Sequence, residues 1–271
     1  MKHIKNFLVL ALTVLMSAHV SAQCTMENTA FSGGEFLSYN LYYNWKFVWV
    51  KAGSASLSTV ESTYKGKKAY RASLTTRGSG KVDQFFVLRD TLLCYTSRDL
   101  APLYFRKGAR EGDRYTVDEV WYDYKGSQVN LTQRRLYKDG TRKTIHNNSK
   151  ICIYDMISIF LRARSFDPTD WKKGHALKIP IADGNGIEYS AQLRYRGKSV
   201  VKADNNKKYR CLELSYMEPD DGKYKEIVRF YVTDDNNHIP IRLDMFLRIG
   251  SAKAFLTSMK GARSEIKSIV K

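Results

Sequence analysis

The amino-acid sequence predicts a mainly β protein: a curved antiparallel sheet or open β-barrel, built from two pseudo-repeats, with one covering α-helix. Apolar and polar residues alternate with period two over most of the chain, as in strands that are half buried. Short polar turns rich in Gly, Asp and Asn separate these runs, which indicates an antiparallel meander. A single segment instead places its apolar residues at the helical period.

The chain begins with the features of a cleaved secretory signal peptide over residues 1–22. Two lysines precede an apolar run of 12 residues, Phe7–Ala18, which is too short to span a bilayer. Cleavage after Ala22 leaves Gln23 as the first residue. A lipoprotein acylated on Cys24 is the weaker alternative, because the position before such a cysteine favours a small residue. We therefore expect a periplasmic protein without a transmembrane span.

Residues 23–271 are expected to form one β domain with two pseudo-repeats, about 34–145 and 172–262. Two pairs of segments resemble each other: GKKAYRASL (66–74) with NKKYRCLEL (206–214), and YTSRDLAPLYF (95–105) with YVTDDNNHIPIRL (231–243). Each unit reads as strand, turn, strand, Asp-containing turn, Pro, strand. Since no flexible linker separates the halves, we expect them to share one curved sheet or barrel.

One helix is expected between the repeats, at about 153–164. Its apolar residues fall at i, i+3, i+4, i+7 and i+8, namely Ile153, Met156, Ile157, Phe160 and Leu161. Such a stripe suits a helix that covers the open side of a sheet. A membrane-binding helix is less favoured, because the segment is short and lies inside the chain.

Three further segments have a core or a surface interpretation. The aromatic-rich stretch YNLYYNWKFVWV (39–50) favours cross-strand core filling over a platform for sugars or acyl chains. The arginine-rich stretch LTQRRLYKDGTRK (131–143) reads as a solvated hairpin, with a patch for anionic headgroups as the alternative. The alternation over Ile187–Tyr195 predicts one half-buried strand.

The chain is basic, with a formal net charge of +18 that falls to +16 when the signal peptide is removed. Export argues against nucleic acid as the partner for this charge, and none is expected. An anionic envelope surface is the partner that the charge suits, and a merely solubilising surface is the alternative.

The cluster Asp234-Asp235-Asn236-Asn237, followed by His238, lies between two alternating runs. Asp and Asn tolerate left-handed backbone and bond to nearby amides, so the position and composition favour a hairpin turn. Pro240 then suits the start of an extended strand. A calcium loop requires acidic residues at alternate positions with a Gly, which this run lacks.

No catalytic residue, metal ligand or cofactor is predicted. The histidines beyond the leader, His146, His175 and His238, are far apart in sequence. Asp118 and Glu119 are adjacent on a predicted strand, so their side chains point to opposite faces and do not converge for glycoside chemistry.

Four cysteines remain after the leader: Cys24, Cys94, Cys152 and Cys211. Export permits disulfides, and four cysteines allow three pairings, among which the sequence does not choose. Buried free thiols are the alternative. No Cys-x-x-Cys is present, so thiol redox chemistry and a zinc knuckle have little support.

Several motifs together resemble one family of exported bacterial proteins, domain of unknown function 3108. They are GEFLSYNLYYNW, VKAGSASLSTVES, YDMISIFLRAR and FYVTDDNNHIPIRLDMFLRIGSAKAFL, which span about Gly34 to Leu256. The resemblance implies a Gram-negative periplasmic or envelope location and a curved antiparallel β structure. This curved β architecture is similar to that of the Lol lipoprotein carriers. The family has no established activity, so no site residues carry over.

These observations favour a non-enzymatic envelope protein that binds a lipid or another apolar ligand on a concave β face, partly closed by the helix. Two alternatives remain. One is an interaction protein for envelope assembly or glycan handling, without an internal cavity. The other is a hydrolase whose site the sequence does not reveal; convergence of His175 or His238 with two carboxylates would favour it.

Overall fold

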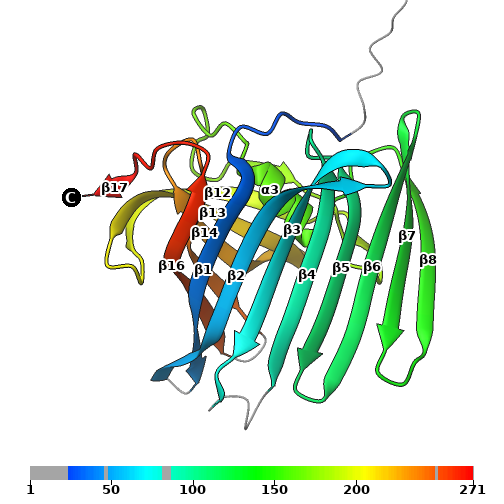
Figure 1. Cartoon of the computed structure of the whole chain (residues 1–271), viewed down its shortest axis with the longest axis horizontal. Coiled ribbons are helices and arrows are strands. Elements are labelled where there is room, and N and C mark those ends of the chain that lie inside the picture. The colour runs from blue at the N-terminus through cyan, green and yellow to red at the C-terminus, as the bar shows by residue number, and fades with distance from the viewer. Residues whose placement is uncertain (1–23, 46–47, 81–86, 248–249, 271) are drawn as a thin grey trace, which may run out of the picture.

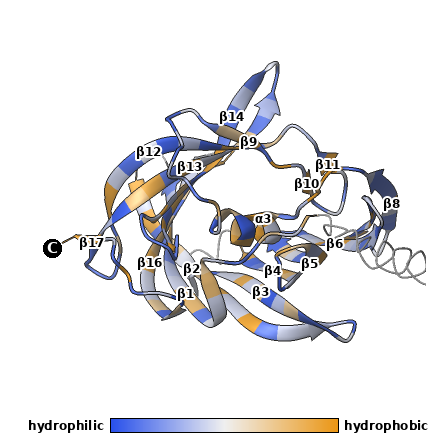
Figure 2. Cartoon of the chain, turned by 90° about the horizontal axis from the view of Figure 1, so that it is seen from above, coloured by the Kyte–Doolittle hydropathy of each residue, from blue (hydrophilic) through white to orange (hydrophobic). Residues whose placement is uncertain are grey.

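The computed structural model describes residues 24–45, 48–80, 87–247 and 250–270, so the predicted signal peptide lies outside the described residues. The described chain is dominated by one antiparallel sheet of 15 strands, with α3 (Met156–Ala163) against its concave side (Figures 1 and 2). This is the mainly β class with one covering helix that the sequence predicts. None of the helices among these residues is long and apolar enough to cross a membrane.

The N-terminal half of the sheet is an uninterrupted meander in which every strand pairs with the next. Its strands are β1 (Phe31–Trp45), β2 (Val48–Tyr64), β3 (Lys67–Gly78), β4 (Leu88–Ser97), β5 (Pro102–Glu111), β6 (Arg114–Lys125), β7 (Gln128–Tyr137) and β8 (Arg142–Ser149).

The C-terminal half is a second meander. It consists of β9 (Ala176–Lys178), β12 (Gln192–Lys202), β13 (Lys208–Asp220), β14 (Lys223–Thr233), β15 (Pro240–Phe246) and β16 (Ser251–Ala262), with β17 (Ile269–Val270) on β13. β10 (Ile181–Ala182) and β11 (Ile187–Glu188) form a separate pair.

The two halves join where β16 pairs with β1, so the chain's last long strand lies beside its first. The strand order begins at β8 and ends at β9, and these two strands do not pair with each other. The sheet is therefore a curled, open half-barrel (Figure 2).

Corresponding turns of the two proposed repeats share local geometry. The pairing shifts register just before the turn in both β4–β5 and β14–β15. Leu100 and His238 then take left-handed backbone, with φ of 58° and 41°, shortly before Pro102 and Pro240 start the next strands. The division into two repeats stays a prediction.

Helix α3 begins three residues later than the predicted residue 153. The Asp155 side chain caps the helix by accepting from the amides of Ile157 and Ser158, and the Ser158 hydroxyl accepts from the amide of Asp155. Ile153 precedes this cap and is fully buried outside the helix. The capping box thus sets the helix start.

The helix packs against both halves of the sheet. Ile157 and Leu161 belong to a core with Phe105 and Leu131 of the N-terminal half. Ile159, on another face, belongs to a second core built from β12, β13 and β14. The short helix is therefore held by tertiary packing, since eight residues alone make an unstable helix.

Three segments differ from their predicted form. Ile187–Tyr195 is not one strand: the Glu188 carboxylate accepts from the amide of Ser190, and the chain bends between β11 and β12. The 131–143 stretch is a hairpin, but Leu131 and Gln133 are buried, so it is solvated on only one face. In 39–50, Tyr39 fills the core as predicted, but Val48–Val50 are exposed.

The exposed end of this aromatic stretch has a simple cause. β2 pairs with β3 only as far as Gly53, so among the described residues Val48–Val50 pair with β1 alone.

Candidate functional site

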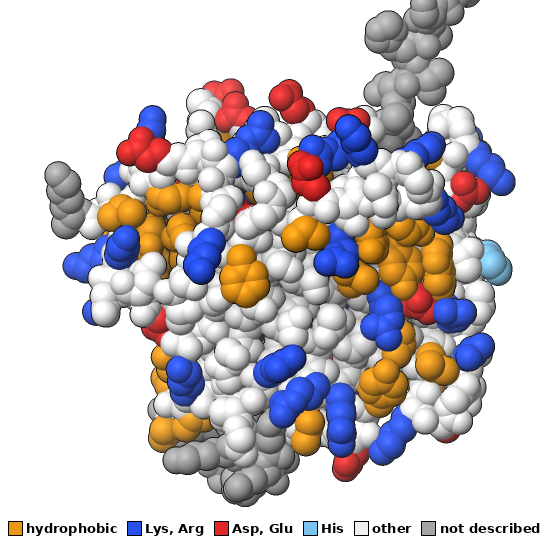
Figure 3. Space-filling model, in the orientation of Figure 1, with side chains coloured by type: hydrophobic (Ala, Val, Ile, Leu, Met, Phe, Trp, Pro, Cys, Tyr) orange, Lys and Arg blue, Asp and Glu red, His pale blue; other side chains and the backbone are white. Residues whose placement is uncertain are grey.

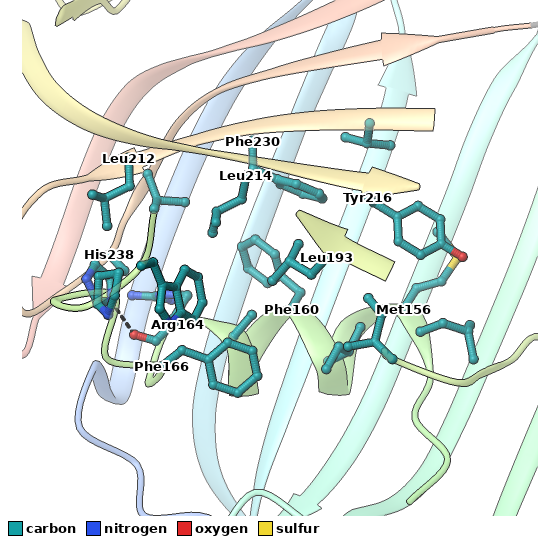
Figure 4. A pocket seen from close by; sticks show the side chains of 18 residues that line it. Met156, Phe160, Arg164, Phe166, Leu193, Leu212, Leu214, Tyr216, Phe230 and His238 are labelled. Atoms are coloured by element: carbon teal, nitrogen blue, oxygen red, sulfur yellow. Dashed lines mark hydrogen bonds between the residues drawn. The ribbon is translucent and has the colours of Figure 1, made fainter. Parts of the chain in front are cut away.

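An apolar pocket lies between α3 and the concave face of β12–β14 (Figure 4). The helix contributes Met156, Ile159 and Phe160 to its wall. Across from them, cross-strand neighbours of the sheet point inward, among them Leu193, Leu212, Leu214, Tyr216, Val228 and Phe230. The period-two alternation of the three strands therefore becomes the wall of a cavity.

The segment between α3 and β9 closes one side of the pocket. Phe166, Pro168 and Trp171 line it from this segment. The Trp171 ring packs against Phe166 and Tyr195, and His175 stacks on it at 5.0 Å. At the end next to Tyr216, the pocket wall includes Met156, which is 50% exposed.

The polar groups at the pocket are engaged elsewhere. The Tyr216 hydroxyl donates to Glu218 at 2.8 Å, and burial raises the pKa of Tyr216 well above its usual value. The Arg164 guanidinium is bound to Glu35, as described below. The remaining lining is almost entirely hydrocarbon and aromatic carbon. Such a wall suits an apolar ligand and offers no charge for a headgroup.

The cavity is small, at about 100 Å³. A cavity of roughly 150 Å³ holds one benzene molecule, and pockets for whole ligands start at about 300 Å³. In this state the pocket accommodates only a short apolar group. A longer chain requires movement of the Phe166–Trp171 segment or of the strands opposite α3.

A buried ion pair fixes the C-terminal end of α3. Arg164 donates to both carboxylate oxygens of Glu35 on β1, at 2.5 and 2.8 Å, and to the carbonyl of Asn237, at 3.0 and 3.2 Å. Arg164 and Glu35 are 2% and 1% exposed. One residue therefore ties together the first strand, the helix and the turn before β15.

His238, which also lines the pocket, belongs to this network. Its Nδ1 lies 2.5 Å from the carbonyl oxygen of Arg164, which can only accept, so Nδ1 carries the proton. Burial lowers the pKa of His238 and favours the neutral ring. This hydrogen bond makes His238 a structural link between the turn and the helix.

The Asp234–Asn237 cluster is a structural turn, as its position predicts. Asp235 accepts from the hydroxyl of Thr233 and from the amides of Asn237 and Ser268. The Asn237 side chain bonds to the backbone of Ser264. The turn thereby holds the C-terminal segment. Within the described residues, no group of three or more His, Cys, Asp or Glu is placed to hold a metal ion.

The histidines and carboxylates considered for catalysis lie on separate elements. His146, on β8, contacts Thr132, while His175 stacks on Trp171 near β9. Asp118 pairs with Arg135 and Glu119 with Arg134, on opposite faces of β6 as the alternation predicts.

A disulfide joins Cys24 to Cys152, while Cys94 and Cys211 are buried free thiols. The first described residues are further held by Arg162, which donates to the carbonyls of Cys24 and Thr25. A sulfur atom in this disulfide cannot also carry a thioether-linked lipid. The disulfide and acylation at Cys24 are therefore mutually exclusive, and the lipoprotein alternative stays a prediction.

Comparison with known protein families identifies the family of this chain. The family model for DUF3108, a protein family of unknown function, matches residues 38–257. The chain therefore belongs to the DUF3108 family. A search of curated proteins found no match.

Solved structures share the fold. A β-barrel-like protein of the DUF1849 family from Brucella abortus superposes with a TM-score of 0.53 at 10% identity, covering 89% of this chain and 100% of that one. A Bacteroides fragilis protein with a YmcC-like fold gives 0.36 at 10% identity, covering 88% and 100%; this likeness is too weak to argue from. The Brucella structure supports the fold alone.

Sequence reasoning located the helix and the concave face, but not the individual pocket residues. The motif YDMISIFLRAR (154–164) contains two residues that the structure explains, Asp155 as the cap and Arg164 as the buried cation. Glu35, the partner of Arg164, lies 129 residues away, and no local signal pairs the two.

Proposed function

We propose that this chain is an exported envelope protein that binds an apolar ligand, such as the end of an acyl chain, without chemical turnover. The pocket between α3 and β12–β14 carries the proposal, because its lining is almost purely apolar and no charged group in it is free. The predicted leader and the Cys24–Cys152 disulfide support a location outside the cytoplasm, since disulfides persist in oxidising compartments.

The shape of the pocket favours a carrier over a deeply enclosed cofactor site. Met156 is half exposed at one end, so a ligand can enter there while its polar part remains in water. The covering segment Phe166–Trp171 contains no helix or strand, and it can yield more readily than the sheet.

A non-enzymatic role is supported by the way in which candidate chemical groups are used. His238 donates to a backbone carbonyl, Asp235 accepts from three neighbouring groups, and Cys94 and Cys211 are buried. A hydrolase would need a nucleophile or a base directed into the pocket, and the lining supplies neither in a free form.

Binding of a fluorescent fatty-acid probe tests this function. Ala163 lines the pocket from α3, and Ala163→Phe places a benzyl group in the cavity. Ala176→Phe, at an exposed position on β9 outside the lining, is the matched control.

The wild type and Ala176→Phe are expected to bind the probe, and Ala163→Phe is expected to bind it at least tenfold more weakly. Circular dichroism confirms that both variants fold. Equal probe binding by Ala163→Phe and the wild type, or no binding by the wild type, contradicts the assignment of the pocket.

A further inference from the structure

The described ends of β1 and β2 and of β15 and β16 lie side by side at one edge of the half-barrel, at the lower left in Figure 1. They are neighbours because Asn44, near the end of β1, pairs with Trp49 on one side and with Ser251 on the other.

The described residues at these strand ends, next to the two turns, expose large apolar side chains. We call these residues the tip surface: Val48 (61% exposed), Trp49 (40%), Val50 (43%), Phe246 (39%) and Leu247 (47%). Scattered exposed apolar residues are common on soluble proteins, but several gathered at one edge, on both faces of the sheet, indicate a binding surface. Orange side chains are visible at this lower left edge in Figure 3.

Two lysines lie beside the tip surface. Lys51 on β2 and Lys253 on β16 are both direct neighbours of Tyr42 on β1. Lys253 lies with its Nζ 4.3 Å from the centre of the Trp49 ring. The neighbouring acid on β15, Asp244, is already paired with Arg242. Lys and Arg also predominate over the lower part of the face in Figure 3.

Two rows of cross-strand neighbours connect this edge to the pocket. The first row runs from Val50 and Tyr43 through Ala252, Met245 and Val228 to Tyr216. The second runs from Leu41 through Ala254, Leu243 and Phe230 to Leu214. Because directly paired residues face the same side of a sheet, each row is a continuous apolar strip on the concave face.

We propose that the tip surface docks on an anionic lipid bilayer, so that the apolar rows lead a lipid chain from the membrane to the pocket. The direction of lipid transfer rests on the proposed function, whereas docking does not. Trp is enriched at membrane–water interfaces. A Lys side chain can lay its apolar stem along the hydrocarbon boundary while its ammonium group reaches the headgroups. The positive charges of Lys51 and Lys253, beside the exposed Trp49, match anionic headgroups.

Co-sedimentation with vesicles tests the docking. The wild type is expected to sediment with vesicles of phosphatidylglycerol and phosphatidylcholine, and less with phosphatidylcholine alone. Trp49→Ala combined with Leu247→Ser should reduce binding at least tenfold, since each removes a large apolar side chain from the bilayer interface. Tyr189→Ala, at a position 48% exposed away from the tips, is the matched control and should bind like the wild type.

The basic component has its own test. Lys51→Glu combined with Lys253→Glu should abolish the preference for phosphatidylglycerol, and 1 M salt should do the same to the wild type. A wild type that stays in the supernatant with both vesicles overturns the proposal, even if the tips bind another protein. Equal sedimentation of the Trp49/Leu247 variant and the wild type also overturns it.

The two proposals fail separately. The Trp49/Leu247 variant is expected to keep its affinity for the soluble fatty-acid probe, while Ala163→Phe is expected to keep its affinity for vesicles. Loss of probe binding in Ala163→Phe with normal sedimentation supports both proposals. Normal probe binding by a protein that ignores vesicles leaves the pocket in place and removes the docking.

Discussion

Removal of the Glu35 carboxylate is expected to destabilise the whole fold. In Glu35→Ala the guanidinium of Arg164 remains at a position that is 2% exposed, with the Asn237 carbonyl and the Phe31 ring as partners but no counter-charge. Breaking one side of a buried ion pair costs about 3–5 kcal/mol, because the remaining charge is desolvated without compensation. For a domain of this size, that free energy corresponds to a fall in Tm of roughly 6–20 °C.

An exposed ion pair provides the control. Glu61 contacts Arg98 at 2.9 Å, but these side chains are 66% and 39% exposed. Glu61→Ala is therefore expected to cost no more than about 1 kcal/mol. Urea denaturation, followed by circular dichroism, measures both variants against the wild type.

A double replacement separates the charge from the packing. Glu35→Leu with Arg164→Met removes both charges and keeps apolar volume, so it should recover much of the stability that Glu35→Ala loses. If Glu35→Ala costs no more than Glu61→Ala, then the buried pair does not hold the first strand, the helix and the turn together, and the reasoning is refuted.

Three more outcomes follow from the same contacts. Burial raises the pKa of Asp155 to about 6, so the stability that this group contributes is greatest below about pH 4 and is lost as the pH rises through 6. In urea denaturation, Asp155→Asn should therefore gain up to about 3 kcal/mol relative to the wild type between pH 4 and pH 7. A difference in unfolding free energy between the two proteins that does not change with pH contradicts this. Replacing Cys24 and Cys152 by Ser should cost roughly 2–5 kcal/mol, since the disulfide closes a loop with a sequence separation of 128; unaltered stability after reduction would refute it. Asp235→Ala should speed amide exchange at Ser268, while calcium leaves the Tm of the wild type unchanged; a calcium-dependent rise in Tm would favour the metal site over the turn.

The local part of the fold was predictable because it has local causes. Period-two alternation and polar turns specify antiparallel hairpins, and the meanders β1–β8 and β12–β16 follow that pattern. The helix stripe was equally visible, and the Asp155–Ser158 box explains its starting point.

Long-range contacts were not predictable from one sequence. The pairing of β1 with β16 joins the two halves into one sheet, but period two fits many partners equally well. The bridge of Arg164 to Glu35 and the choice of Cys24 with Cys152 depend on this long-range arrangement. The exposed Val48–Val50 segment was misjudged because aromatic residues occur in cores and on binding surfaces alike.

The central claim is that the pocket under α3 holds an apolar ligand. Native mass spectrometry of the protein, isolated without detergent from the cells that export it, tests this claim most directly. The account predicts an adduct with the mass of an acyl-bearing molecule, lost in Ala163→Phe and retained in Ala176→Phe. An adduct-free protein that also takes up no added fatty acid would contradict the account.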